Sequence, residues 1–194
     1  MTEKPLDLYG DESPIGAAPA PGGKMTPFGL TVLAAAILMI GVVLWAIYDN
    51  SRGGLEGGPA PEFTLPLIGA EGEFDLAEHR GNVVVINFWG SWCPPCRAEA
   101  PMLQSAYADY QSEGVVFVGI AVDDTATNAL AFMDEFGITY PNVMDIGGEM
   151  EDAYRTQGVP ETFVIDRDGD IHTFFFAPPP ESDLRAAIEA ALET

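Results

Sequence analysis

The sequence predicts an α/β domain, with a central mixed β-sheet flanked by helices, that follows one long apolar helix. Three observations carry this prediction. Short apolar runs have the β-branched composition of buried strands, and stretches with helical spacing of apolar residues separate them. An uncharged segment of 22 residues precedes them all.

The uncharged segment extends from Pro27 to Tyr48. As a helix it would be about 30 Å long, which is the hydrocarbon thickness of a bilayer. Trp45 and Tyr48 suit the lipid–water interface at its C-terminal end. A cleaved signal peptide is the alternative, but its apolar region would be shorter and would end at a small-x-small site, whereas residues 48–52 are Tyr-Asp-Asn-Ser-Arg. We therefore predict an uncleaved signal anchor that crosses the membrane once.

The segments on either side of this span have different compositions. Residues 1–26 are rich in Pro, Gly, Ala and acidic residues, which predicts a disordered cytoplasmic tail. Both lysines precede the span and Arg52 follows it, so the positive-inside rule favours a cytoplasmic N-terminus by a small margin. The glycine-rich residues 49–60 predict a flexible linker, and residues 61–194 predict one domain on the far side of the cytoplasmic (inner) membrane, facing the periplasm or the cell exterior.

The chain is strongly acidic, with 8 Lys and Arg against 30 Asp and Glu and a formal net charge of −22. Nucleic-acid binding is not expected, because it requires a basic patch that meets phosphates. From Gly57 onward the sequence has 5 arginines and 24 acidic residues. Such a charge steers basic partners toward a protein, but it is also typical of a generic acidic surface.

The first half of the domain begins with an extended segment at Pro61–Pro66 and a turn at Gly69–Gly72. The continuous apolar run at Val83–Trp89, which is rich in β-branched residues, predicts a strand that is buried on both faces. Apolar residues at three- and four-residue spacing then predict a helix from Pro94 to about Ser112. A second central strand is predicted at Val115–Val122.

The second half is predicted to begin with a helix that Thr125 or Thr127 caps and that Gly137 ends. The remaining predicted elements are a short strand at 140–144, a short helix at 149–156, a strand at 162–166, a hairpin turn at 167–170, a return strand at 171–176, and a helix from Ser182 or Asp183 to Leu192. The alternation of strands and helices predicts a parallel centre with helices on both faces, to which the hairpin adds antiparallel strands.

The two cysteines of the chain, Cys93 and Cys96, form a C-x-x-C pair between the predicted strand at 83–89 and the predicted helix at 94–112. This position is typical of a redox motif. Unpaired backbone N–H groups and the positive dipole end of a helix N-terminus favour a thiolate at Cys93. A thiolate is the species that attacks a disulfide.

Other roles for a cysteine pair fit this sequence less well. Structural zinc has about four ligands, and the two histidines, His79 and His172, are isolated from each other. Haem attachment would require a histidine at the position of Arg97. A purely structural disulfide would close a very small loop and would stabilise the fold weakly.

Two motifs resemble the thioredoxin superfamily, and the resemblance covers about residues 60–192. They are Asn-Phe-Trp-Gly-Ser-Trp-Cys-Pro-Pro-Cys-Arg-Ala-Glu at 87–99 and Gly-Val-Pro-Glu-Thr-Phe-Val-Ile-Asp at 158–166. More narrowly, they resemble the membrane-anchored thiol–disulfide oxidoreductases of the TlpA, ResA and DsbE (CcmG) group. The resemblance implies a thioredoxin-like fold and reduction of disulfides outside the cytoplasmic membrane, notably those of apocytochrome c before haem attachment.

The resemblance also assigns roles around the redox-active disulfide. Cys93 would attack the client, and Cys96 would resolve the mixed disulfide. Pro160 would be the cis-proline that faces the dithiol, with the Val159 backbone placed beside Cys93 for pairing with a client strand. An ordinary proline at the start of a strand is the alternative for Pro160. Glu161 would line the substrate groove.

Glu99 follows Cys96 by three residues, so both lie on one helix face. A carboxylate there would raise the pKa values of the dithiol and relay a proton to Cys96, although a surface glutamate is the commoner outcome. Asn87 stands where cytosolic thioredoxin has a buried aspartate. Because asparagine is neither acid nor base, proton transfer would fall to Glu99 or to water.

The residues around the motif are expected to control access to the sulfur atoms. Trp92, Pro94 and Pro95 would shape the approach of the client, leaving Cys93 accessible and Cys96 more shielded. Trp89 and the three phenylalanines at 174–176 are expected to pack in the core rather than to form a binding surface, with partial exposure of the phenylalanines.

These inferences predict a membrane-tethered, extracytoplasmic thiol–disulfide oxidoreductase that reduces apocytochrome c through Cys93 and Cys96, without a metal or cofactor. Its expected partners are disulfide-bonded proteins, an upstream membrane thiol reductant, and the lipid bilayer around residues 27–48. Two alternatives remain. One is a general extracytoplasmic disulfide reductase or oxidase with other clients, and the other is a redox-inactive binding module for an assembly factor.

Overall fold

The structure is a computed structural model that describes residues 26–50 and 55–194. The predicted tail before residue 26 and residues 51–54 of the predicted linker lie outside the described residues. The chain divides near residue 50 into two compact units. The elements in chain order are α1 (Pro27–Asn50), β1 (Thr64–Pro66), β2 (Glu73–Asp75), the 3₁₀ helix η1 (Leu76–His79), β3 (Val83–Trp89), α2 (Pro94–Tyr110), β4 (Val115–Val122), α3 (Ala126–Phe136), β5 (Asn142–Asp145), α4 (Glu149–Tyr154), β6 (Glu161–Ile165), β7 (Ile171–Phe175) and α5 (Glu181–Leu192).

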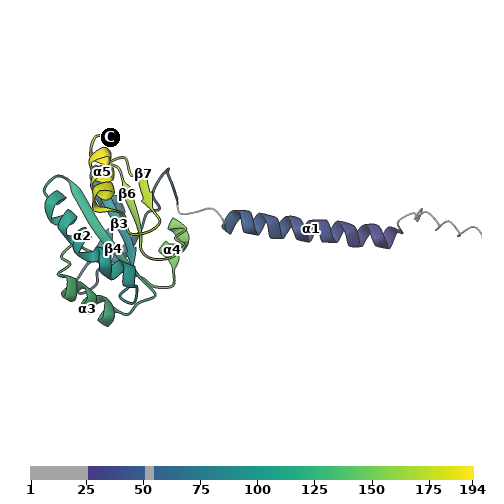
Figure 1. The fold of residues 1–194 in the computed structure, drawn as a ribbon, viewed down its shortest axis with the longest axis horizontal. Helices are drawn as coiled ribbons and strands as arrows, with labels where there is room; N and C mark the ends of the chain where they lie inside the picture. The colour runs from purple at the N-terminus through teal and green to yellow at the C-terminus, as the bar shows by residue number, and fades with distance from the viewer. Residues whose placement is uncertain (1–25, 51–54) are drawn as a thin grey trace, which may run out of the picture. The chain divides into compact units, whose positions relative to one another are not determined.

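Helix α1 is a single uninterrupted helix of 24 residues (Figure 1). It has the length and apolar composition needed to cross a membrane, and none of its apolar span is buried within the protein. Exposed apolar residues over such a length require a lipid or protein environment. The helix is therefore a candidate membrane anchor.

The second unit has the thioredoxin-like α/β fold, built on a five-stranded mixed sheet in the order β5-β4-β3-β6-β7. Strands β3, β4 and β5 are parallel, whereas β6 and β7 run antiparallel to β3 and to each other. The predicted parallel centre with an added hairpin is thus confirmed. Because of this topology, the carboxyl ends of three strands and the first residue of β6, Glu161, meet at one edge of the sheet.

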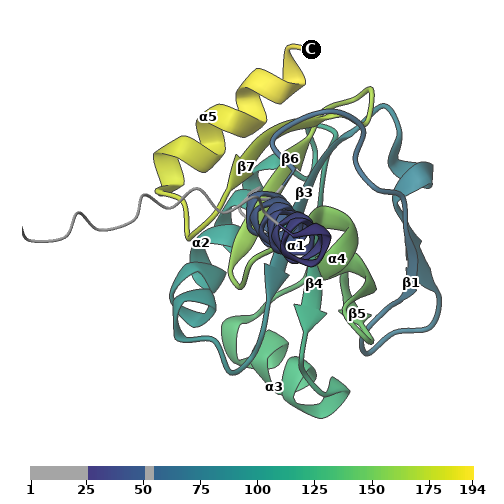
Figure 2. The same cartoon turned by 90° about the vertical axis from the view of Figure 1, so that its right-hand side faces the viewer.

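Both faces of the sheet are covered, as the continuous apolar runs predict. Along β3, Val83, Val85 and Trp89 point into one apolar cluster with residues of α2, α3 and α5. The alternate residues of β3 point into a second cluster that includes Tyr154 of α4 and residues of the N-terminal segment. Figures 1 and 2 show α2 and α5 on one side of the sheet and α4 on the other.

Trp89, the last residue of β3, is anchored in the core as predicted, with 2% of its surface exposed. Its indole stacks on Phe132 of α3 with ring centroids 4.3 Å apart, and its Nε1 donates to Asn142 Oδ1 at 2.9 Å. Gly119 of β4 leaves room for this hydrogen bond, because a Cβ there would lie 1.9 Å from Asn142 Oδ1. The start of the loop that follows β3 is consequently fixed.

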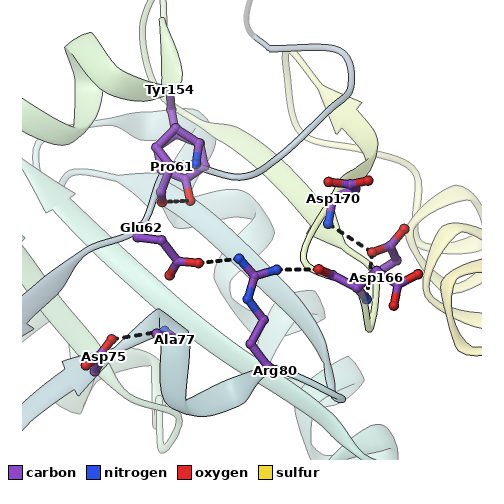
Figure 3. Close-up of polar contacts among 9 residues, drawn as sticks. Pro61, Glu62, Asp75, Ala77, Arg80, Tyr154, Asp166 and Asp170 are labelled. Carbon is purple, nitrogen blue, oxygen red and sulfur yellow. Dashed lines mark hydrogen bonds and ion pairs between the residues drawn. The ribbon is translucent and has the colours of Figure 1, made fainter.

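The residues before β3 pack against the domain through a small hairpin and an ion pair. Strands β1 and β2 pair antiparallel, and Leu67 just beyond β1 bridges to β5. Arg80 lies between the carboxylate of Glu62 and the backbone carbonyl of Asp168 in the β6–β7 turn, as Figure 3 shows for its guanidinium. This contact connects the start of the domain to the far hairpin of the sheet.

The end of the predicted linker is held by backbone hydrogen bonds. Leu55 N–H donates to the carbonyl of Tyr154 at 3.4 Å, and Ala60 N–H donates to that of Gly169 at 3.0 Å. Tyr154 also donates its hydroxyl to the Pro61 carbonyl at 2.8 Å (Figure 3). Part of the segment that composition predicts as a tether is therefore ordered, because its backbone groups find partners on the domain.

Candidate active site

The cysteine pair lies where β3 ends and α2 begins, as the sequence predicts, and the two sulfur atoms form a disulfide. Cys93 is the N-cap of α2, and its Sγ accepts a hydrogen bond from the Cys96 backbone N–H at 3.1 Å. Pro94 follows at the first helical position, where proline suits the helix because its missing N–H would have no partner there. The N-terminus of α2 thus presents its partial positive charge to Cys93.

The loop before β6 supplies the opposite wall of the site. The Val159–Pro160 peptide bond is cis, as the resemblance to the thioredoxin superfamily implied. The carbonyl oxygen of Val159 lies 3.5 Å from Cys93 Sγ. Backbone with this placement offers a client strand hydrogen-bonding groups directly beside the sulfur that would be attacked.

The expected accessibility of Cys93 is wrong for the oxidised protein. Cys93 and Cys96 are each only 1% exposed. Cys93 is covered because its sulfur is held between the first turn of α2 and the Val159 carbonyl. Trp92, by contrast, is 55% exposed, so the neighbouring side chain rather than the cysteine reaches the surface.

Glu99 is buried below the disulfide, one helical turn after Cys96, and is only 4% exposed. The Nδ2 of Asn87 in β3 donates to Glu99 Oε1 at 2.9 Å and also lies 3.1 Å from Thr162 Oγ1 of β6. Among the described residues, Glu99 Oε2 is one of two buried side-chain oxygen atoms without a hydrogen-bond partner. Asn87 therefore holds one carboxylate oxygen and leaves the other free.

Burial raises the pKa of Glu99 from 4.5 to about 7, and the hydrogen bond from Asn87 opposes part of this rise. Burial has this effect because a charged carboxylate loses its hydration in the protein interior. The group consequently changes protonation near neutral pH. A side chain with such a pKa beside a dithiol can both accept and return a proton.

Glu161 directly follows Pro160 as the first residue of β6, at the wall opposite the cysteine pair, and it is only 1% exposed. Its Oε1 accepts from the Gln157 backbone N–H at 2.8 Å, while its Oε2 is the second buried oxygen without a partner in the described part of the chain. Burial raises its pKa, hydrogen bonds from the Gln157 and Gly158 backbone N–H groups lower it, and nearby Glu151 acts in the same direction as burial. Two partly unsatisfied carboxyl groups thus flank the disulfide region.

Three contacts that sequence reasoning missed fix the loop between β3 and Cys93. Asp124 Oδ2 accepts from the Ser91 backbone N–H at 2.6 Å. Trp92 Nε1 donates to the Val122 carbonyl at 3.3 Å, and the indole sits so close to Gly90 that a Cβ there would meet Nε1 at 2.6 Å. One available signal was the pair Asp123 and Asp124 directly after β4, since the C-terminal ends of parallel strands lie together at one edge of the sheet.

Arg97, which stands at the position where haem attachment would need histidine, connects α2 to α3. Its guanidinium pairs with Glu135 and lies 5.7 Å and 5.0 Å from the ring centroids of Phe132 and Phe136. It also donates to the Ser91 carbonyl at 3.5 Å. Its observed contacts therefore brace the loop that leads into the cysteine pair.

The described residues contain no group of three or more His, Cys, Asp or Glu side chains arranged to hold a metal ion. The chemistry that the site supports comes from its own groups. They are a disulfide at a helix N-terminus, a facing carbonyl and a buried carboxyl group with a pKa near neutrality. This combination suits exchange between the cysteine pair and an external disulfide.

Comparison with known proteins agrees with this chemistry. Residues 57–174, more than half of the chain, match the AhpC/TSA family. The chain belongs to the AhpC/TSA family. Proteins to which it is similar by sequence include several that are named thiol–disulfide oxidoreductases.

Two proteins named thiol–disulfide oxidoreductase ResA illustrate the relationship within the AhpC/TSA family. The one from Oceanobacillus iheyensis is 34% identical over 142 residues, which cover 70% of this chain and 74% of the relative. The one from Bacillus subtilis is 30% identical over 141 residues, which cover 72% and 78% respectively. With the cysteine pair in place, these relationships make this chain a thiol–disulfide oxidoreductase.

Solved structures give the same result. A putative thiol:disulfide interchange protein DsbE from Chlorobium tepidum is 31% identical with a TM-score of 0.66, over 71% of this chain and 97% of that one. A secreted disulfide oxidoreductase of Mycobacterium tuberculosis, described as homologous to DsbE of E. coli, is 29% identical with a TM-score of 0.60, over 66% and 95%. The chain is thus an AhpC/TSA protein of the ResA and DsbE type.

Proposed function

We propose that this protein is a membrane-tethered, extracytoplasmic reductase of protein disulfides, and that its clients include apocytochrome c. The observation that carries the proposal is the Cys93–Cys96 disulfide at the N-terminus of α2, facing the carbonyl of Val159. The resemblance to the TlpA, ResA and DsbE group supplies the client class. The acidic chain, with a formal charge of −22, suits a basic client.

The reaction that we propose transfers two electrons from the reduced dithiol to the client. The Cys93 thiolate attacks one sulfur of the client disulfide, so that a Cys93–client bond forms and the client's own S–S bond breaks. Cys96 then attacks Cys93 Sγ, the Cys93–Cys96 bond forms, and the second client thiolate leaves. The two protons of the dithiol end on the client thiols, and an upstream membrane thiol reductant restores the dithiol.

Glu99 supports the direction of this transfer toward reduction of the client. A strong disulfide-forming oxidant owes its potential to a reduced form whose thiolate is stabilised. A buried carboxyl group one turn after Cys96 does the opposite, because its negative charge disfavours a neighbouring thiolate. The dithiol of this protein is accordingly expected to give up its electrons readily.

Helix α1 supports the membrane tether, because its apolar stretch Pro27–Ala46 has no charged residue and is long enough for a single span. The lysines that precede it and the small positive-inside bias support a cytoplasmic N-terminus. The redox domain would then work at the outer surface of the cytoplasmic membrane. In that compartment cysteine pairs tend to be oxidised, so a reductase has substrates there.

Trapping in cells tests this proposal. The variant Cys96→Ala lacks the resolving thiol, so Cys93 should remain covalently joined to its clients. Purification of the full-length variant from membranes and mass spectrometry of the attached proteins is expected to recover c-type apocytochromes. The double variant Cys93→Ala/Cys96→Ala is the matched control and should recover none of them. Trapped clients that include no c-type apocytochrome would contradict the proposed client.

A further inference from the structure

A shallow groove of about 210 Å³ lies beside the disulfide and is lined almost entirely by apolar groups. One wall is the segment Gly158–Glu161, which includes the cis-proline, and Pro95 of α2 borders it. The other wall is the segment that follows β7, where Phe176, Ala177 and Pro178 line the groove. None of these apolar side chains takes part in the proposed electron transfer.

The groove is continuous with the site of sulfur exchange. Val159 belongs to both, since its carbonyl lies 3.5 Å from Cys93 Sγ and the residue also lines the groove. The strand register also brings Phe176 close to this site. Thr162 of β6 pairs with Phe175 of β7, so Phe176 lies just beyond the last pair and next to Glu161. A client bound at Cys93 therefore reaches Phe176 without leaving the surface of the domain.

Phe176 differs from the two phenylalanines before it. Phe174 and Phe175 are half-buried against the sheet, whereas Phe176 is 60% exposed. The expected partial exposure of the three phenylalanines is confirmed, and it is greatest at Phe176 because this residue lies past the end of the strand pairing. Large apolar side chains left exposed at the edge of a reactive site commonly mark a contact surface.

The geometry of an extended client selects which of its residues meets the groove. Successive side chains of a strand point to opposite faces, so a cysteine directed at Cys93 has its neighbours two positions away on the same face. Those neighbours lie about 7 Å along the strand. We infer that Phe176 is a specificity-determining residue, and that the groove takes an apolar side chain of the client two positions from the cysteine under attack.

Glu161 closes the inner wall of the same groove. It lines the groove but is only 1% exposed, and its oxygen Oε2, which has no hydrogen-bond partner among the described residues, is buried. A client in the groove therefore meets the apolar side chains rather than this carboxyl group. Phe176 is the large exposed side chain that the groove offers.

This inference rests on the proposed reduction of client disulfides by Cys93, and its test separates the two. The reduced full-length protein in detergent micelles is given synthetic peptides, each with one intramolecular disulfide and equal charge. The peptides differ only in having Leu or Ser two positions before or after the cysteine that Cys93 would attack. Wild type should reduce one Leu peptide with a second-order rate constant roughly tenfold above that of its Ser counterpart, which is within the range of discrimination by one apolar contact.

Three variants report on Phe176. Phe176→Ser should reduce the Leu-to-Ser ratio to about one, and Phe176→Leu should retain most of it, because leucine keeps the apolar wall. Ile146→Ser is the matched control, since Ile146 is 80% exposed but does not line the groove, and it should leave the ratio unchanged. The reduction potential should be the same in all of them, which excludes an effect on the dithiol itself.

Binding of peptides that carry Ser in place of both cysteines gives a readout that needs no electron transfer. The same Leu-over-Ser preference in wild type and its loss in Phe176→Ser would support the groove even if Cys93 proved not to reduce the peptides. Reduction of both peptides at one rate by wild type, or an unchanged preference in Phe176→Ser, would overturn the assignment. Concentration-dependent dimerisation that Phe176→Ser abolishes would assign the groove to a second copy of the chain and overturn it as well.

Discussion

Replacing Cys93 by serine is expected to lower the rate of disulfide reduction by about a thousandfold or more, because the attacking thiolate is lost. Replacing Cys96 by alanine should have a different result. The first attack proceeds, one client thiol is released, and the reaction then stops at the mixed disulfide. The difference follows from the placement of Cys93 as the N-cap of α2 and beside the Val159 carbonyl.

Pre-reduced full-length variants and a disulfide-containing peptide provide the measurement. Gel analysis without reductant should show a covalent adduct with Cys96→Ala and none with Cys93→Ser. Both variants should retain the fold, since the lost disulfide closes a short loop and contributes little unfolded-state entropy. Far-UV circular dichroism checks this. An adduct with Cys93→Ser, or full turnover by it, would contradict the assigned roles.

Replacing Glu99 by glutamine is expected to stabilise the oxidised protein above pH 7 by about 3 kcal/mol relative to wild type. The pKa of Glu99 is about 7 in the folded protein against 4.5 ordinarily, because the carboxyl group is buried. Between these two values the folded state binds more protons than the unfolded state. Wild type therefore loses stability as the pH rises from 4.5 to 7, and the loss is complete above pH 7.

Urea unfolding of the full-length oxidised protein across this pH range tests the effect. Glu99→Gln should show no such loss, because its amide has no charge to bury. Glu113→Gln is the control at an exposed position in the turn between α2 and β4 and should follow wild type. In the reduced protein, thiolate absorbance should show that Glu99→Gln lowers the pKa of the dithiol, since a neighbouring negative charge is gone. If the free energies of unfolding of Glu99→Gln and wild type differed by the same amount at every pH, this account would be contradicted.

The sequence predicted the central strands well because their residues carry a strong local signal. The predicted strands at Val83–Trp89 and Val115–Val122, both rich in β-branched residues, match the observed strands β3 and β4 in both bounds. Thr125 and Gly137 also cap α3 as residues of their type do. The hairpin of β1 and β2 gave no such signal, since each strand has three residues and depends on contacts with the rest of the domain.

The features of the active site that depend on local sequence were predictable, whereas those that depend on packing between elements were not. The C-x-x-C motif and the helix spacing placed Cys96 and Glu99 on one buried face. The hydrogen bond from Asn87 to Glu99 depends on how β3 lies against α2, which no local pattern encodes. Likewise, the burial of Cys93 and the exposure of Phe176 are decided by the Val159 loop and by where the pairing of β7 ends.

Those packing contacts explain how the N-terminus of α2 can suit the proposed reductase. The dipole of α2 stabilises a thiolate at Cys93, while the buried Glu99 disfavours one at Cys96. In the proposed reaction, attack is thereby assigned to Cys93 and resolution to Cys96. The net effect on the potential depends on which influence is larger, and the buried carboxyl group, which lacks a partner for Oε2, is expected to dominate.

The midpoint potential of the dithiol tests the central claim, that this protein is a reductase, most directly. The full-length protein is equilibrated with mixtures of reduced and oxidised glutathione, and the fraction of Cys93–Cys96 disulfide is measured after thiol labelling. The account predicts a midpoint of about −200 mV or lower, in the range of thioredoxin-like reductants. A midpoint near about −120 mV, the value of a strong disulfide-forming oxidant, would contradict it.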